Sequence, residues 1–295
     1  MKPFVKWVGG KRQLLPELRK RYPFSIYPIT KYAEPFVGGG AVLWDILSTY
    51  PSIKEVYISD MNSELINVYR CIRSHIHPLI AILAAMEKEF TVLDNEGRKR
   101  YYYQKRDWYN QLHKRQEEDS ILQAALFICL NKTGFNGLYR VNQKDEYNVP
   151  IGYSKHPVIC DTENLYALTK ILQRLTIVSG EYQDSLQFID ENTFVYLDPP
   201  YKPLTATAAF TAYTKDRFTD DEQESLADYV HTLDKHGVKF LLSNSDPTNT
   251  DPTNTYFNRL YEPYNIDRVW ANRMINSNAS KRGKISELLI YNYKL

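Results

Sequence analysis

The sequence lacks the features that would direct a protein to a membrane, out of the cell or around a metal. No stretch of its 295 residues approaches the roughly 20 apolar residues that span a bilayer. The opening residues MKPFVKWVGGKRQ contain no apolar core of a signal peptide. Cys71, Cys129 and Cys160 stand far apart, without a disulfide framework or a metal-ligand spacing. We therefore expect a soluble, cytoplasmic protein that uses no metal.

The chain also lacks a strong net charge, which is +2 at pH 7, but its charges are unevenly distributed. Residues 98–115, RKRYYYQKRDWYNQLHKR, carry seven Lys or Arg and one acidic residue, Asp107, with aromatic residues between them. Such interleaving is typical of nucleic-acid surfaces. A solvated helix face has the same composition, so this segment alone leaves both interpretations open.

Alternating strand and helix patterns predict an α/β fold. YAEPFVGGGAVLWDIL predicts a strand, a glycine turn and a helix, and EVYISD predicts a second strand that ends at Asp60. The pattern is mostly helical from Asn62 to about Thr133, and NGLYRVNQKDEYNVPIG then predicts a β-hairpin. We expect one discontinuous α/β domain, residues 1–64 and 161–295, with an inserted, mainly helical domain, residues 65–160, that carries the hairpin.

The segment FVYLDPPYKP ends an apolar strand with an acid and two prolines. Prolines cannot donate to a strand ladder, so the strand stops at Asp198, at the end where open α/β sheets bind ligands. A base amine is a poor nucleophile that improves when both of its N–H bonds are accepted. Asp198 and the Pro199 carbonyl supply two acceptors, and Tyr201 offers a face on which an extruded base can stack. The segment predicts methyl transfer to a base amine by positioning and electrostatics.

The glycine turn EPFVGGGAVL resembles a dinucleotide fingerprint but departs from it. Gly38 and Gly40 fill the first two positions of G-x-G-x-x-G, whereas Leu43 occupies the third. Asp60 ends the next strand, where an acid can accept hydrogen bonds from ribose hydroxyls. S-adenosylmethionine has a ribose but no pyrophosphate, so the turn favours this cofactor over NAD, although a plain tight turn before a helix has the same residues.

Taken together, the chain resembles the Dam-type DNA adenine methyltransferases, the D12 class, and most closely the GATC enzymes of restriction-modification systems. The matching segments are KWVGGKRQLLP, EPFVGGGA, SDMNSELIN, NGLYRVN with YNVPIG, LDPPYKPLTATAAFTAYT and KRGKISELLIYNY. They stand in the family's order and cover nearly the whole chain. The resemblance implies a Rossmann-like fold, S-adenosylmethionine as donor with S-adenosylhomocysteine as product, and methylation of N6 of a flipped-out adenine, within GATC, in double-stranded DNA.

The resemblance also implies roles for individual residues. After NVP the GATC enzymes usually show G-R-Y-K, where this chain has GYSK with Tyr153 and Ser154. The implied catalytic residues are Asp198, Pro199, Pro200 and Tyr201. The implied cofactor contacts are Trp7, Gly9, Lys11, Glu34, Phe36, Gly38, Gly40, Asp60 and Asp198. The implied DNA contacts are Lys6, Phe135, which would wedge against the base stack, Asn136, Leu138, Arg140 and Pro150.

Two other interpretations of these motifs stay open. Related D/N/S-P-P-Y motifs also serve methylation of RNA, of cytosine N4 or of a protein glutamine, and a DNA-binding regulator could share the basic segment. The basic module with its hairpin disfavours protein and small-molecule substrates, and a regulator would tolerate loss of the tetrapeptide or the glycine turn. We expect a monomeric enzyme in the cytoplasm, on the nucleoid through its DNA, with a GATC restriction endonuclease as a candidate partner in the same system.

Overall fold

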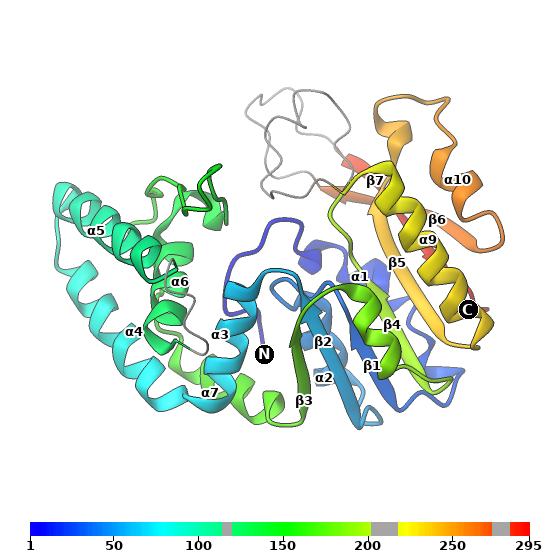
Figure 1. Ribbon diagram of the computed structural model, residues 1–295, viewed down its shortest axis with the longest axis horizontal. Coiled ribbons are helices and arrows are strands. Elements are labelled where there is room, and N and C mark those ends of the chain that lie inside the picture. The colour runs from blue at the N-terminus through cyan, green and yellow to red at the C-terminus, as the bar shows by residue number, and fades with distance from the viewer. Residues whose placement is uncertain (114–119, 202–217, 273–283) are drawn as a thin grey trace.

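A computed structural model describes residues 1–113, 120–201, 218–272 and 284–295. Seven strands of this described part form one sheet in the order β3-β2-β1-β4-β5-β7-β6 (Figure 1). The first five strands pair in parallel, and β7 runs antiparallel to both of its neighbours. The strands are β1 (Lys31–Glu34), β2 (Glu55–Asp60), β3 (Leu175–Ser179), β4 (Thr193–Leu197), β5 (Lys239–Ser245), β6 (Asn265–Asn272) and β7 (Lys284–Tyr291).

Helices cover both faces of the sheet, which explains why its central strands are almost wholly apolar. Every residue of β4 is buried. Phe194 and Tyr196 pack into the core on one face, with α2, α3 and α6, while Val195 and Leu197 pack into the core that α9 covers. The helices are α1 (Leu15–Arg19), α2 (Ala41–Thr49), α3 (Ser63–Ser74), α4 (Ile76–Thr91), α5 (Asn95–His113), α6 (Ile121–Thr133), α7 (Thr162–Leu172), α9 (Asp220–Lys235) and α10 (Tyr256–Leu260).

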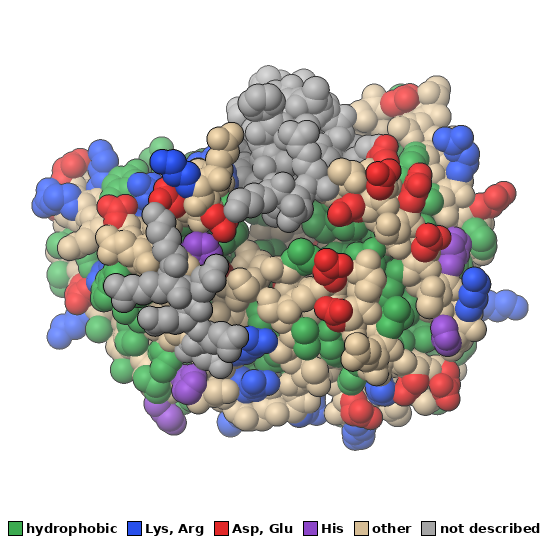
Figure 2. Space-filling view, viewed as in Figure 1, with side chains coloured by type: hydrophobic (Ala, Val, Ile, Leu, Met, Phe, Trp, Pro, Cys, Tyr) green, Lys and Arg blue, Asp and Glu red, His purple; other side chains and the backbone are tan. Residues whose placement is uncertain are grey.

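A helical module lies beside the sheet and is formed by α4, α5, α6 and the loop that follows α6 (Figure 1). It enters the chain between β2 and β3, where α3 and α7 connect it to the sheet. The predicted boundary between residues 64 and 65 falls inside the first turn of α3, and α3 packs against β2 and β3 as well as against α6. Figure 2 shows Lys and Arg side chains along the helical module and a group of Asp and Glu side chains on the other half of the molecule.

The predicted hairpin is present, but its pairing is sparse. Its two legs are joined by two isolated antiparallel bridges, Gly134 with Ile151 and Val141 with Tyr147. The Asn136–Gly137 pair opens the hairpin, and both residues have positive φ, 54° and 62°. The chain therefore turns sharply after α6, in a conformation that glycine and asparagine adopt more readily than other residues.

Candidate active site

Three acidic residues lie together at the carboxyl edge of the parallel strands. Glu34 ends β1, Asp60 ends β2 and Asp198 follows β4 directly. From β1 the chain adds strands on one side of the sheet, and from β4 it adds them on the other side. The strand order therefore reverses between β1 and β4. Ligands of open α/β sheets bind at such a switch point. The topology therefore places the residues predicted for cofactor and catalysis in one region.

Asp198 is held by two donors on one of its oxygens. Lys11 Nζ lies 2.7 Å from Asp198 Oδ1, and Ser243 Oγ donates to the same atom at 3.1 Å. Within the described residues Oδ2 has no hydrogen-bond partner. Burial raises the pKa of Asp198, and the Lys11 ammonium opposes this effect. The carboxylate is thus fixed in orientation with one oxygen able to accept a further hydrogen bond.

Tyr201 is held beside this carboxylate from two sides. Its hydroxyl donates to Glu287 Oε2 at 2.7 Å, and Lys11 Nζ lies 4.6 Å from the centre of its ring. Burial raises the pKa of Tyr201, so the phenol stays neutral and donates. Between the two groups, Pro199 is buried and Pro200 is exposed. A rigid turn therefore presents an acid, a carbonyl and an aromatic ring next to each other.

The glycine turn after β1 is closed by contacts that only glycine permits. Gly38 has φ +48°, and a Cβ there would lie 2.7 Å from Trp7 Cδ1. Gly40 has φ +71°, and its Cβ would lie 2.7 Å from the Tyr69 hydroxyl. Asp60 Oδ2 accepts from Gly38 N at 3.0 Å, so the acid at the end of β2 orients the turn at the end of β1.

The other residues predicted for the cofactor differ in their surroundings. Glu34 is 2% exposed and accepts from the Tyr32 hydroxyl at 2.6 Å, and burial raises its pKa. Phe36 is half-buried and stacks on Tyr182. Gly9 is exposed, and its carbonyl accepts from Lys11 Nζ at 2.9 Å. Glu34 and Phe36 are therefore enclosed by neighbouring side chains, whereas Gly9 lies at the surface.

The residues predicted for DNA gather where the N-terminal segment meets the hairpin. Lys6, Asn136 and Pro150 are exposed, and the remaining three, Phe135, Leu138 and Arg140, are half-buried. The Arg140 guanidinium is held by the opposite leg, because its Nε donates to Asn148 Oδ1 at 2.6 Å and its Nη2 to the Asn148 carbonyl at 3.2 Å. Tyr153 is 90% exposed and meets the edge of Phe135, with ring centres 6.2 Å apart.

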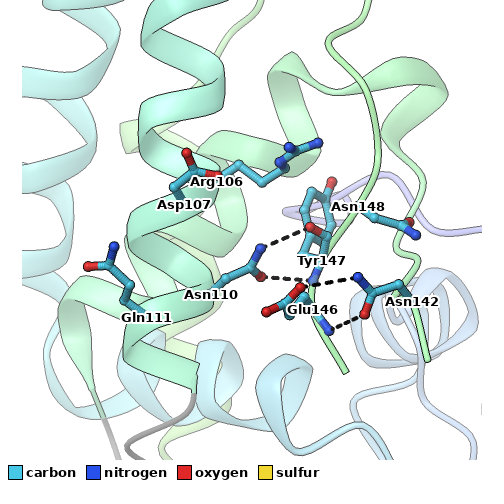
Figure 3. Close-up of a pocket in the computed structure, with 8 residues that line it drawn as sticks. All are labelled: Arg106, Asp107, Asn110, Gln111, Asn142, Glu146, Tyr147 and Asn148. Atoms are coloured by element: carbon cyan, nitrogen blue, oxygen red, sulfur yellow. Dashed lines mark hydrogen bonds between the residues drawn. The ribbon is translucent and has the colours of Figure 1, made fainter. Parts of the chain in front are cut away.

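Asn110 of α5 holds the hairpin by two hydrogen bonds to its backbone. Asn110 accepts from Tyr147 N at 2.8 Å and donates to the Tyr147 carbonyl at 3.1 Å (Figure 3). Beside this contact, a polar cavity of about 300 Å³ opens between α5 and the hairpin. Its lining includes Arg106, whose buried Nε has no hydrogen-bond partner within the part of the chain that the structure describes. The cavity belongs to the helical module and is not part of the Asp198 site.

The basic segment predicted for nucleic acid is only partly available at the surface. Lys99 and Arg100 are exposed. Arg98 donates to the carbonyls of Lys155 and Thr91, and Lys105 lies 3.6 Å from Glu89. Lys114 and Arg115 lie outside the described residues, as do the parts of the family motifs that fall within residues 202–217 and 273–283. The exposed pair is therefore the better test of a phosphate contact.

A histidine joins the start of α3 to the tip of the hairpin. His113 Nδ1 lies 2.9 Å from Glu64 Oε1, and its Nε2 lies 3.4 Å from Asp145 Oδ2. The hydrogen bond to Glu64 is the main cause that raises the pKa of His113 above its usual range. Charged His113 therefore stabilises the fold fully below about pH 6.5, and the contribution is lost as pH rises through the raised folded pKa.

We expect His113→Gln to lower the melting temperature most at about pH 6 and progressively less toward about pH 9. Thermal melts of both proteins across this range measure the gap. His156→Gln is the matched control, because His156 is exposed. A gap that stays constant with pH would show that the ring contributes only by packing.

Sequence reasoning missed the residues that orient Asp198 and Tyr201, the two side chains predicted to act on the base. Ser243 lies in β5 and Glu287 in β7, each distant in sequence from the residue that it holds. The only local signal is a serine within the apolar strand KFLLSNS. Among the described residues, no group of three or more His, Cys, Asp or Glu side chains could bind a metal, and no helix has the length and apolarity needed to cross a bilayer.

Comparison with known proteins identifies the family to which the chain belongs. The profile of the D12 class N6 adenine-specific DNA methyltransferases matches residues 7–275. The chain is 46% identical to the type II methyltransferase M.MjaIII of Methanocaldococcus jannaschii over 99% of both chains. It is 36% identical to M1.LlaDCHI of Lactococcus lactis, over 99% of this chain and 96% of that one. It is 34% identical to the DNA adenine methylase of Escherichia coli, over 97% and 93% respectively. With its mixed seven-stranded sheet and its D-P-P-Y turn, this chain belongs to the D12 class of N6 adenine-specific DNA methyltransferases.

Proposed function

We propose that the enzyme takes its methyl group from S-adenosylmethionine and that it methylates the adenine of GATC in double-stranded DNA. The observation that carries the proposal is the Asp198 carboxylate, fixed through one oxygen at the sheet's switch point beside the glycine turn. Family membership supports methylation of DNA adenine. The donor, the target sequence and the roles of individual residues are our proposals.

The residues around the glycine turn fit a nucleoside with a sulfonium and no pyrophosphate. Asp60 uses one lone pair of each oxygen on Gly38 N and Asn62 N, which leaves further lone pairs for ribose hydroxyls. Met61 is 61% exposed directly beside Asp60 and offers an apolar surface to an adenine ring. S-adenosylmethionine, when bound, supplies an electrophilic methyl group. The proposed contacts are Trp7, Gly9, Lys11, Glu34, Phe36, Gly38, Gly40, Asp60 and Asp198.

The D-P-P-Y turn acts on the target adenine. Asp198 accepts one N6–H bond through Oδ2, because Lys11 and Ser243 occupy Oδ1. The Pro199 carbonyl accepts the other N–H, and the two acceptors turn the nitrogen lone pair toward the methyl group. Tyr201 stacks on the extruded base and replaces the stacking that the base loses on leaving the duplex. In this mechanism the rate gain comes from positioning and fixed charge.

The hairpin and the N-terminal segment read the target. We assign Lys6, Phe135, Asn136, Leu138, Arg140 and Pro150 to DNA, within a target-recognition domain of residues 65–160 inserted into the catalytic domain. The major groove admits a two-stranded ribbon, and an arginine fork matches the two acceptors of guanine. We further propose that the enzyme acts as a monomer in the cytoplasm. Two relatives carry the name type II methyltransferase, which supports a restriction endonuclease as its functional partner. That this endonuclease cuts GATC follows only from the target sequence that we propose.

Protection of DNA from digestion tests the proposed sequence. Genomic DNA from a methylation-deficient host that expresses the enzyme should resist an endonuclease that methylation of GATC adenine blocks. DNA from the same host with the Asp198→Asn variant is the control and should be cut. Labelled S-adenosylmethionine, supplied with DNA or RNA, tests the donor and the substrate class separately. If the DNA is labelled but is still cut at GATC, the proposed donor is supported and the proposed target sequence is wrong.

The exposed pair on α5 gives a separate prediction. Lys99→Glu with Arg100→Glu should weaken binding to any duplex, and the negative slope of log Kobs against log salt should become less steep by about 0.9 for each phosphate that the variant no longer neutralises. Matched reversals of Lys54 and Lys235, which are exposed near the amino ends of the strands, should leave the slope unchanged. An unchanged slope for the α5 pair would make this segment a solvated helix face.

A further inference from the structure

Asn131 is a buried amide that joins two segments distant in sequence. It lies near the end of α6 and is 2% exposed. Its Oδ1 accepts from Lys6 N at 2.8 Å, and its Nδ2 donates to the Lys6 carbonyl at 2.8 Å and to the Gly137 carbonyl at 2.9 Å. Both amide hydrogens are therefore used, and every partner is a backbone atom. The Asn131 side chain thus bridges the backbone of the N-terminal segment and the backbone at the start of the hairpin.

The two segments that Asn131 joins are in direct contact. Gly137 has φ +62°, and a Cβ at this position would overlap Lys6 Cβ and lie 2.6 Å from Lys6 Cδ. The turn therefore has no room for a side chain, and Lys6 packs on the backbone of Gly137. The Lys6 side chain and Asn136 are both exposed here. The contact brings two proposed DNA-binding residues to one edge of the molecule.

The residue after Lys6 touches the cofactor turn. Trp7 Cβ would lie 3.1 Å from a Cβ at Gly39, and the Trp7 ring closes over Gly38. The same ring stacks on Tyr139 from the hairpin, with centres 5.9 Å apart and planes 26° apart. Four residues later, Lys11 reaches Asp198. Residues 6–11 thus contact the hairpin, the cofactor turn and the catalytic carboxylate in succession.

We propose that Asn131 is a positioning residue that couples binding of the cofactor to binding of cognate DNA. It fixes the start of residues 6–11 on the hairpin, so a ligand that immobilises Trp7 also immobilises Lys6 and Gly137. The ligand that binds second meets a segment that is already ordered. By linkage, the cofactor and the DNA then raise each other's affinity by the same factor. This inference rests on S-adenosylmethionine as the proposed cofactor.

The coupling factor is measured as the ratio of two dissociation constants. The Kd of a GATC duplex is determined by fluorescence anisotropy without and with saturating S-adenosylhomocysteine. We expect the wild-type ratio to be at least about 5, the lower end of typical coupling. Asn131→Asp keeps an acceptor for Lys6 N but replaces the donor that holds two carbonyls. The ratio for this variant should fall to about 1, because the two sites become independent.

Asn164→Asp is the matched control on the same N-terminal segment. Asn164 makes the same pair of backbone hydrogen bonds, from Lys2 N at 3.1 Å and to the Lys2 carbonyl at 2.9 Å, but these bonds are exposed, and their partner is Lys2 rather than a residue of the hairpin. Its substitution should lower the melting temperature slightly and leave the coupling ratio at the wild-type value. A ratio that falls equally in both variants would mean that any loosening of the segment has this effect, and the role of Asn131 would be rejected.

A second pair of variants probes the same contact without touching the buried amide. Gly137→Ala pushes the turn away from Lys6, whereas Gly237→Ala adds a methyl group at a similar φ of +73° with no atom within 4 Å. Gly137→Ala should lose the coupling and Gly237→Ala should keep it, so the result stands even where Asn131→Asp fails to fold. Wild-type coupling that persists in Gly137→Ala would overturn the inference. Failure of the wild type to bind S-adenosylhomocysteine would instead reject the proposed cofactor.

Discussion

Replacement of Asp198 by Asn is expected to lower the rate of adenine methylation at least about 100-fold, the loss typical for one preorganised electrostatic group. The reason is local. Lys11 and Ser243 hold Oδ1, so the reaction depends on what Oδ2 accepts. An amide either places a donor against the N6–H bond or offers a weaker, uncharged acceptor in its place.

The variant should remain folded, because Asp198 lies after the last residue of β4 rather than within it. The asparagine oxygen can still accept from Lys11 Nζ, so the 5% exposed ammonium keeps a partner. Single-turnover methylation of a GATC duplex measures the rate, and a thermal melt reports the fold. A folded Asp198→Asn protein with near-normal turnover would remove Asp198 from the mechanism.

Asp190→Asn is the matched control for this experiment. Asp190 precedes the same strand at its opposite end, where it lies 3.0 Å from Lys31 Nζ. It is an aspartate paired with a lysine, as Asp198 is, but 40% of its side chain is exposed and it lies away from the carboxyl edge. Asp190→Asn should leave the methylation rate unchanged. This result would show that the rate depends on the charge of Asp198 and not on the loss of any carboxylate near the sheet.

The strands could be predicted from sequence because the apolar pattern of each strand lies within the strand itself. EVYISD forms β2 with the predicted bounds, and the apolar run before Asp198 forms β4. The start and end of α9 also follow from its own residues, because Thr219, a common N-cap residue, accepts from Glu222 N and Gly237 follows the helix with positive φ. The family could be predicted because its motifs are short, stand in a fixed order and are spread along the chain. The match of the family profile to residues 7–275 confirms it.

The orientation of the site could not be predicted in the same way. Asn131 stands in ILQAALFICLNKT, a helix that is nearly all apolar, and nothing within this helix identifies Lys6 as its partner. Glu287 reaches Tyr201 only because β7 inserts between β5 and β6. Charge counting also gave Arg98 the same role as Lys99, whereas the structure turns Arg98 toward the Lys155 carbonyl. Contacts set by the packing of remote elements leave no local pattern.

Replacement of Arg140 by Ala is the second large expected effect, and it concerns a single base pair. Asn148 holds the guanidinium through Nε and Nη2, so its orientation is set before DNA arrives. A preoriented fork loses little side-chain entropy when it meets the two acceptors on the major-groove edge of guanine. Arg140→Ala should therefore cost about 1–3 kcal/mol against the proposed target GATC and less against a site in which that guanine is replaced.

The measurement is the methylation rate on GATC and on each single-base variant, for the wild type and for Arg140→Ala. Asn148→Ala should relax discrimination at the same base pair but by less, because it releases the fork without removing it. Lys99→Ala provides the contrast, since removing a cation that neutralises a phosphate should lower the rate equally on every sequence. If Arg140→Ala also lowered the rate uniformly, Arg140 would contact the backbone. Another side chain of the hairpin would then have to read the base. Asn136 is the next candidate, because it is exposed and its amide can hydrogen-bond a base edge.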